Sequence, residues 1–362
     1  QMAQVTATEL AALGINMNLA PVLDVNDNPY NPVIGLRSLG SSPAEVARLG
    51  AAMIREYAAC GVVATAKHFP GHGHTSVDSH VGLPLVDRTL EDWQSTDLAP
   101  FQAAIDAGVD AIMTAHVLVP AYDPSGLPAT LSPTILQGML RQRLGFRGLI
   151  LTDSMTMGAI DQSYGSAQAA VMAFQAGADV LSFGADWGHT PAEQRAAYAE
   201  LLGQVQSGAI STARLDESVR RILLVKARYG ILDVPARLAR QPITPETIAS
   251  AVGTPAHRQV AAAIARRSIT LVRDREGRLP IGPQHSLLLV WPTVAGDPLP
   301  GVRAYRPAAQ MVTYRPDPTA QEIAQVVAQA EGVDTVVVGT FDTANHPGQA
   351  QLVEALAARA PL

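Results

Sequence analysis

The densest group of potentially reactive side chains is the stretch from Lys67 to His80, KHFPGHGHTSVDSH, which contains four of the nine histidines. Two glycines and a proline make this stretch a loop. Histidine is the side chain best suited to proton transfer near neutral pH. An aspartate two residues away can hold one ring nitrogen and so fix the tautomer of the imidazole. Asp78 and His80 are therefore predicted to form a general acid/base dyad.

A metal site is the alternative interpretation of the same loop. His72 and His74 are spaced like the paired ligands of zinc hydrolases, and further candidates could complete the site: Asp78, His80, His116 and Asp153. This inventory would suit a metal-dependent amidohydrolase barrel. Lys67 and His68 hold the strand end where such barrels usually carry the pair, however, and a lysine there would repel a divalent cation. No metal and no cofactor are therefore expected.

Asp153 places a carboxylate at the end of the apolar run 149–152. An aspartate at this position can be a simple structural cap. Cleavage of a glycosidic bond, however, requires a carboxylate that faces a proton donor across the sugar. Asp153 would then attack the anomeric carbon as nucleophile, and His80 would protonate the leaving oxygen and later deprotonate the incoming water.

The first two-thirds of the chain alternate strand and helix, which is the pattern that would position these side chains. Ser42 to Glu45 reads as a capping box that starts a helix ending at Gly61. Expected strands are 14–21, 62–68, 109–114, 148–152 and 178–183. Apolar strands of this kind indicate a parallel sheet covered by helices. Polar groups follow several strands, namely Asp24, His68, His116 and Asp153, which favours a (β/α)8 TIM-type barrel over a doubly wound sheet.

Composition changes near the middle of the chain, where residues 231–255 become rich in proline. We interpret 236–255 as an irregular linker between a barrel-like catalytic domain, 1–235, and part of an α/β sandwich domain, 256–362. Strands of the second domain are expected at 268–272, 286–290 and 335–339.

Bulk composition excludes several classes of protein. The chain has 362 residues, of which 48% are hydrophobic and 16% charged, so it can bury large cores. A net charge of −6 argues against a nucleic-acid partner. The sequence contains no apolar run long enough to predict a membrane span. Cys60 is the single cysteine, so an intrachain disulfide is excluded. Oligomeric state and compartment stay open.

The motifs resemble those of glycoside hydrolase family 3, and within it those of the bacterial β-N-acetylglucosaminidases. The resemblance rests on KHFPGHGHTSVDSH, LTDSMTMGAI, MTAHV and PATLS, and it extends to NLAPVLDVN, IGLRSLG and ARRSITLVRD. It implies that Asp153 is the nucleophile and that Asp78 and His80 are the acid/base pair on a mobile loop. The implied reaction is the retaining release of terminal β-linked N-acetylglucosamine by double displacement, from cell-wall fragments or chitin oligosaccharides.

The resemblance also implies the residues that hold the sugar. Lys67 and His68 match the pair that hydrogen-bonds sugar hydroxyls, and Arg37 matches a sugar-contacting arginine. Asp24 is placed with this substrate-binding group as a support of the pocket, whereas His116 is expected to pack behind the site.

Departures from the family pattern leave alternatives open. The family carries an Asp-x-Glu-Gly-Gly segment at an early strand that this sequence lacks, so we expect about two initial βα units, and later strands of the second domain, to be missing from the chain. An imidazole base, unlike a carboxylate, would not repel phosphate, so a phosphorylase using the same residues is the second prediction. A β-glucosidase is less favoured, because those branches generally draw a glutamate acid/base from elsewhere.

Overall fold

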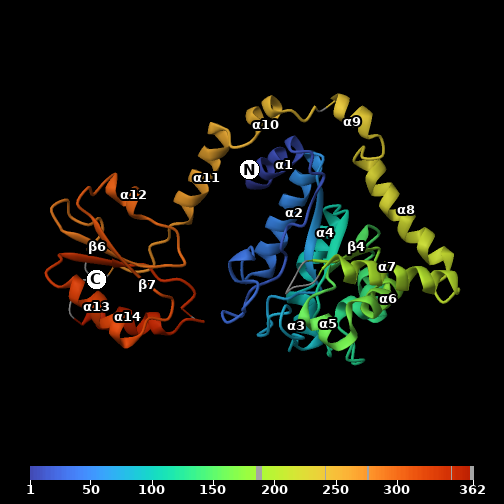
Figure 1. Cartoon of the computed structure of the whole chain (residues 1–362), viewed down its shortest axis with the longest axis horizontal. Helices are drawn as coiled ribbons and strands as arrows, with labels where there is room; N and C mark the ends of the chain where they lie inside the picture. The colour runs from blue at the N-terminus through green and yellow to red at the C-terminus, as the bar shows by residue number, and fades with distance from the viewer. Residues whose placement is uncertain (185–189, 241, 275–276, 344, 359–362) are drawn as a thin grey trace. The chain divides into compact units, whose positions relative to one another are not determined.

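The computed structural model describes residues 1–184, 190–240, 242–274, 277–343 and 345–358 (Figure 1). The chain divides into two compact units, Gln1–Arg266 and Arg267–Leu362. This division lies C-terminal to the expected linker at 236–255.

The first unit is built on a parallel sheet whose five strands lie side by side in their order along the chain. They are β1 (Met17–Asn18), β2 (Val63–Phe69), β3 (Ala111–Thr114), β4 (Leu149–Ser154) and β5 (Val180–Ser182). Sequential parallel strands joined by helices are the arrangement found in α/β barrels. The expectation of a parallel α/β domain is thus confirmed, with five strands in the described residues where a closed barrel has eight. β1 is much shorter than the expected strand 14–21.

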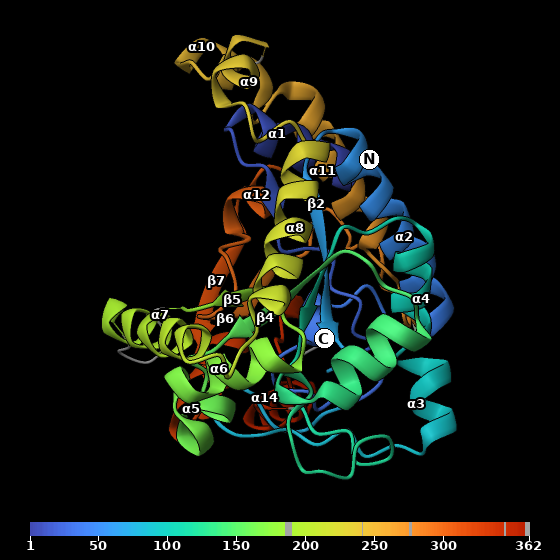
Figure 2. The same cartoon turned by 90° about the vertical axis from the view of Figure 1, so that its right-hand side faces the viewer.

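Helices cover both faces of this sheet. One face, with Ala64, Ile112 and Ile150, belongs to the large apolar core. On the other face Met113 and Leu151 pack with Val225 of α8, the long helix that lies in front of the strands in Figure 2. The helical segments are α1 (Met2–Ala12), η1 (Gly35–Arg37), α2 (Pro43–Ala59), α3 (Leu90–Thr96), α4 (Ala99–Asp106), η2 (Ala129–Leu131), η3 (Thr134–Arg143), α5 (Gly158–Tyr164), α6 (Ser166–Ala176), α7 (Pro191–Gln206) and α8 (Thr212–Arg228).

The start of α2 differs from expectation. Ser42 is its N-cap residue and Pro43 follows in the first turn, but the Ser42 side chain makes no capping hydrogen bond. Glu45, the expected partner in the capping box, instead forms an exposed ion pair with Arg48. The helix stops as expected before Gly61, which has a φ of +75° that favours glycine.

The proline-rich segment 231–255 is not irregular, which corrects the prediction from its composition. It contains α9 (Val234–Arg240) and α10 (Pro245–Ala251), and α11 (Pro255–Ser268) follows. Pro245 lies in the first turn of α10, where proline lacks only a hydrogen bond that the helix would not make. The segment also docks on α1, because Glu9 accepts a hydrogen bond from the Gly253 amide and pairs with His257.

The second unit contains a three-stranded parallel sheet in the order β7-β6-β8, with apolar clusters on both faces. Its elements are β6 (Leu287–Pro292), α12 (Leu299–Arg303), β7 (Gln310–Tyr314), α13 (Ala320–Ala330), β8 (Thr335–Val338) and α14 (Gly348–Ala357). The expected strand at 268–272 is wrong: this apolar run pairs with no strand in the described residues, and Val272 is 91% exposed. β7 lies in a stretch for which the sequence pattern predicts no strand.

No helix in the described part of the chain is long and apolar enough to cross a membrane.

A buried carboxylate ties the strands of the first unit to η3 and α8. The Asp179 side chain accepts hydrogen bonds from Arg141 Nη2 at 2.6 Å, Arg221 Nη1 at 3.0 Å and Ser218 Oγ at 2.6 Å. It also accepts one from the backbone amide of Ile150 in β4 at 3.0 Å. Removing this carboxylate would leave the buried Arg141 guanidinium without its counter-charge.

We therefore expect Asp179→Ala to lower the free energy of unfolding by about 3–5 kcal/mol, the range measured when one partner of a buried ion pair is removed. Urea unfolding measures this loss. Glu45→Ala, which removes an exposed ion pair, is the matched control and should change stability little. Equal effects of the two substitutions would contradict the assignment of Asp179 as a buried hub.

Candidate active site

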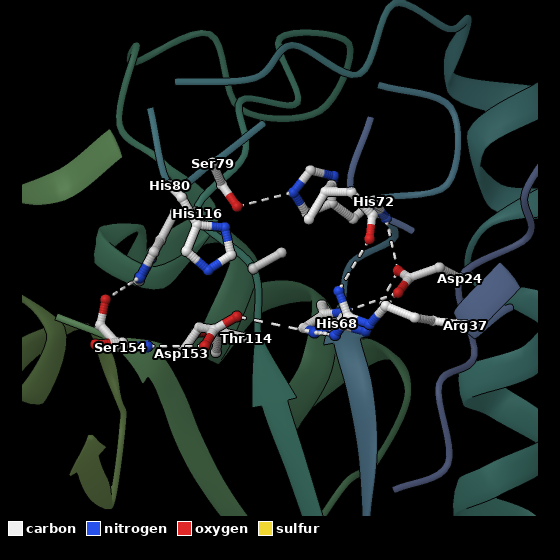
Figure 3. A network of polar contacts seen from close by, with 12 residues as sticks. Asp24, Arg37, His68, His72, Ser79, His80, Thr114, His116, Asp153 and Ser154 are labelled. Atoms are coloured by element: carbon white, nitrogen blue, oxygen red, sulfur yellow. Dashed lines mark hydrogen bonds and ion pairs between the residues drawn. The ribbon is translucent and has the colours of Figure 1, made fainter. Parts of the chain in front are cut away.

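A pocket lies at the carboxyl ends of the strands, and it is lined by five of the seven residues predicted to form the site (Figure 3). Its walls are formed by Leu19, Val33, Ile34, Arg37, Lys67, His68, His72, Ser79, His80, Met113, Asp153 and Met157. The two other predicted residues, Asp24 and Asp78, each hold a histidine of this wall. The loop after β2 and the end of β4 thus bring their reactive side chains to one place.

Asp153 lies near the end of β4, with one carboxylate oxygen directed toward β2. Oδ1 accepts a hydrogen bond from the Ser154 amide at 2.8 Å, and Oδ2 lies 3.8 Å from Nε2 of His68. Burial works to raise the pKa of Asp153, but the neighbouring His68 and His116 outweigh it, so the pKa is lowered. The carboxylate is therefore ionised at neutral pH, as a nucleophile must be.

His68 is oriented by Asp24, which is completely buried. Nδ1 of His68 lies 2.7 Å from Oδ2 of Asp24, and since a carboxylate can only accept, Nδ1 carries the proton. Nε2 is thereby turned to the pocket, 3.3 Å from Nη2 of Arg37. Burial opposes ionisation of Asp24, but His68 and His72 hold the pKa of this carboxyl below its usual range. Asp24 supports the pocket from behind His68 and is absent from its lining.

Asp78 orients His80 in the same way at the rim of the pocket. Nδ1 of His80 lies 2.7 Å from Oδ1 of Asp78, which also accepts the His80 backbone amide at 2.8 Å. Nδ1 therefore carries a proton, and Nε2 is left for exchange with a ligand. The His80 side chain is 38% exposed, in contrast to the buried His68. The structure thus brings the two residues of the predicted dyad into contact through Nδ1 of His80.

Lys67 and Arg37 add positive charge to the pocket. Burial of Lys67 and the charge of Arg37 lower the pKa of the lysine, whereas Asp153 and Asp24 act to raise it. Arg37 is exposed and is fixed by a hydrogen bond from Nη1 to the carbonyl of Val33 at 3.1 Å. These two cations are placed to bind the oxygen atoms of a polar ligand.

His116 is buried behind Asp153, as the packing role predicted for it requires. Nε2 lies 2.9 Å from the carbonyl oxygen of Ser154 and Nδ1 lies 2.8 Å from Oγ1 of Thr130. Burial lowers the pKa of His116. Both ring nitrogens have protein partners, and through Ser154 the imidazole holds the end of β4 that carries Asp153.

The histidines of the zinc alternative point to different partners. Nδ1 of His74 pairs with Asp27 at 2.9 Å, while His72 uses both ring nitrogens on Thr75 and Ser79. Within the described residues, no group of three or more His, Cys, Asp or Glu side chains is arranged to hold a metal ion. The pair that suggested a metal-dependent amidohydrolase is therefore not assembled as a ligand pair.

The sequence suggests His72 only as a metal ligand, whereas in the structure it is a buried residue that supports the histidine-rich loop. It is 3% exposed, and its backbone carbonyl accepts a hydrogen bond from Nδ2 of Asn31 at 2.8 Å. The threonine three residues later was the available signal, since a hydroxyl at that spacing can reach both the ring and the carbonyl of His72. No sequence signal pairs Asn31 with His72.

Residues 1–225 match the sequence profile of the family described as Glycosyl hydrolase family 3 N terminal domain. Beta-hexosaminidase A of Pseudoalteromonas piscicida is 36% identical over 294 residues, which cover 78% of this chain and 48% of that protein. The chain therefore spans about half the length of this curated relative.

Solved structures of relatives align over almost the whole chain. A glycoside hydrolase family 3 beta-N-acetylglucosaminidase from Paenibacillus sp. str. FPU-7 is 40% identical, with a TM-score of 0.88 over 99% of this chain and 68% of that one. The beta-glucoside phosphorylase BglX is 27% identical, with a TM-score of 0.79 over 93% of this chain and 63% of that one.

Because His72 is buried, the free energy of unfolding is expected to depend on pH through this residue. Burial is the main cause that lowers the pKa of His72, from 6.5 to about 4. Between these values the unfolded chain binds a proton that the folded chain does not, so stability falls as the pH decreases through this window. The interval corresponds to about 3 kcal/mol.

We expect His72→Gln to remove about 3 kcal/mol of the stability difference between pH 7 and pH 4. Urea unfolding of both proteins across this pH range measures the two slopes. His346→Gln is the control, because this histidine is partly exposed beside Asp317. Parallel slopes for the wild type and His72→Gln would show that His72 titrates normally.

Proposed function

The chain belongs to glycosyl hydrolase family 3, and on this premise we propose that the protein is a retaining β-N-acetylglucosaminidase that releases terminal sugars through a glycosyl–Asp153 intermediate. One observation carries the proposal: an ionised carboxylate, Asp153, and an imidazole oriented by a carboxylate, His80, line the same pocket.

In the first step, an oxygen of Asp153 forms a bond to the anomeric carbon while the bond from that carbon to the leaving oxygen breaks. The leaving oxygen takes the proton of Nε2 of His80, and Asp78 stabilises the imidazole through Nδ1. Arg37, Lys67 and His68 bind the hydroxyl groups of the sugar, since all three line the pocket.

In the second step, His80 acts as the base. Nε2 takes a proton from water as the water oxygen attacks the anomeric carbon, and Asp153 leaves as a carboxylate. Two inversions at the anomeric carbon give net retention. Protonated and neutral His80 therefore alternate, and the enzyme returns to its starting state.

The names of the relatives support the substrate class. The similar proteins are a beta-hexosaminidase and a beta-N-acetylglucosaminidase, so we assign N-acetylglucosamine at the end of cell-wall fragments or chitin oligosaccharides. We further propose that the five strands are part of a (β/α)8 barrel and that the second unit is part of an α/β sandwich domain, because one solved relative aligns over 99% of the chain.

Phosphorolysis is the second candidate. The similarity to a beta-glucoside phosphorylase favours it, and so does the charge of the pocket. Lys67 and Arg37 line the pocket with His80, and an imidazole base does not repel an incoming phosphate as a carboxylate would.

Asp153→Ala is expected to reduce the release of para-nitrophenol from the N-acetyl-β-D-glucosaminide by at least about 10⁴-fold, because it removes the nucleophile. Asp106→Ala, which removes an exposed carboxylate at the end of helix α4 outside the pocket, is the control. A 2-fluoro sugar with a good leaving group should add one glycosyl unit to Asp153, detectable by peptide mass. Labelling of another residue would overturn the assignment.

An assay with added phosphate distinguishes hydrolysis from phosphorolysis. For a hydrolase, the rate of sugar release is unaffected by added phosphate and by EDTA, and the product is the free sugar. A rise in rate with phosphate and formation of sugar 1-phosphate would favour the phosphorylase. The matching β-glucoside belongs in the same assay, and preference for it over the N-acetyl substrate would contradict the proposed substrate class.

A further inference from the structure

Ser79 and His80 form a short segment that is hydrogen-bonded to His72 on one side and to the start of α5 on the other. We infer that His72 and Gly158 are positioning residues that clasp this segment, and so place His80 opposite Asp153 for proton transfer. The clasp is defined here as the hydrogen bond between Ser79 and His72 together with the bonds from the Ser79 and His80 carbonyls to α5. The inference rests on the proposed acid/base role of His80.

The hydrogen bonds around His72 define its tautomer. Oγ1 of Thr75 donates its one proton to the backbone carbonyl of His72 at 2.9 Å, so it can only accept from Nδ1 at 2.6 Å. Nδ1 therefore carries the proton of the ring. Nε2 is then the acceptor of a neutral imidazole, and the Ser79 hydroxyl donates to it at 3.0 Å. A pKa of about 4 keeps this ring neutral at pH 7.

The backbone of His72 is itself fixed through both its amide and its carbonyl group. Its backbone amide donates to Oδ1 of Asp24 at 2.8 Å, and its carbonyl accepts from Nδ2 of Asn31 at 2.8 Å. His72 and Ser79 are each 3% exposed, so the bond between them is shielded from water. Ser79 directly precedes His80, and its side chain therefore ties this segment to the fixed side chain of His72 (Figure 3).

The other side of the clasp is made by the first turn of α5. The Gly158 amide donates to the carbonyl of His80 and the Ala159 amide to the carbonyl of Ser79, both at 3.1 Å. A Cβ atom on Gly158 would lie 2.5 Å from the His80 carbonyl oxygen and 3.2 Å from that of Val81. Only glycine permits this approach, although the backbone conformation of Gly158 is one that alanine adopts.

The clasp connects the acid/base to the nucleophile. α5 follows β4, which carries Asp153, so the segment of His80 is bonded to the chain that leaves the nucleophile. Proton transfer needs an acid within hydrogen-bond reach of the leaving oxygen, and small displacements of a catalytic group cost large factors in rate. Asp78 therefore selects the reactive nitrogen, and the clasp sets where that nitrogen lies.

Ser79→Ala and Gly158→Ala test the two sides separately, in the full-length protein. Aryl N-acetyl-β-glucosaminides with a poor leaving group need the acid, whereas a dinitrophenyl leaving group departs without it. We expect each variant to lose about tenfold or more in kcat/KM for the poor leaving group and less than about threefold for the activated one. A purely structural effect would lower both values equally.

Gly203→Ala is the matched control for the glycine, because it adds a methyl group to a helix with no described atom within 4 Å of the new Cβ. Gly203→Ala should leave kcat/KM unchanged for both substrates. His80→Ala separates the inference from the function on which it rests. If His80→Ala shows the leaving-group selectivity and the clasp variants do not, the clasp is disproved; if His80→Ala lacks the selectivity as well, the acid/base role itself fails.

Discussion

The site depends on one buried charge, the carboxylate of Asp24. A carboxylate that is fully removed from water must be satisfied by hydrogen bonds and opposite charge, or it is protonated. Asp24 meets this requirement by accepting the ring of His68 and the backbone amides of His68 and His72. The same bonds fix the end of β2 and the start of the histidine-rich loop. The arrangement of the pocket follows from satisfying this carboxylate.

The site uses the same chemical device twice, with opposite exposure. Asp24 and Asp78 each accept Nδ1 of a histidine, and each leaves Nε2 turned to the pocket. His68 is buried and packed between Asp24 and Arg37, so it suits the binding of a ligand. His80 is partly exposed at the rim, where it can exchange protons with a leaving group and with solvent. Burial, rather than residue type, distinguishes the binding role proposed for His68 from the proton transfer proposed for His80.

Sequence alone predicted that the polar candidate residues lie at the ends of strands, because apolar runs that end in polar residues are typical of a parallel sheet. Prediction from sequence failed where one composition is compatible with two different local structures. Proline-rich chain can be irregular or can start helices, as Pro245 does. An apolar run such as 268–272 becomes a strand only if a neighbouring strand is available to pair with it. The role of His72 depends on contacts with Asn31, far along the chain, that no local pattern encodes.

In the proposed mechanism, the charge of the pocket changes when a glycosyl bond to Asp153 forms. Asp153 raises the pKa of Lys67 against the effects of burial and Arg37, and an ester at Asp153 would remove that contribution. Lys67 and Arg37 would then share the pocket without the charge of Asp153, while Asp24 would still raise the pKa of Lys67 from behind His68. An anionic acceptor would restore the balance, whereas water would not. In the proposed mechanism, the choice between water and phosphate therefore depends on the charge of the intermediate, and that charge is set partly by Lys67 and Arg37, the residues proposed to bind the sugar.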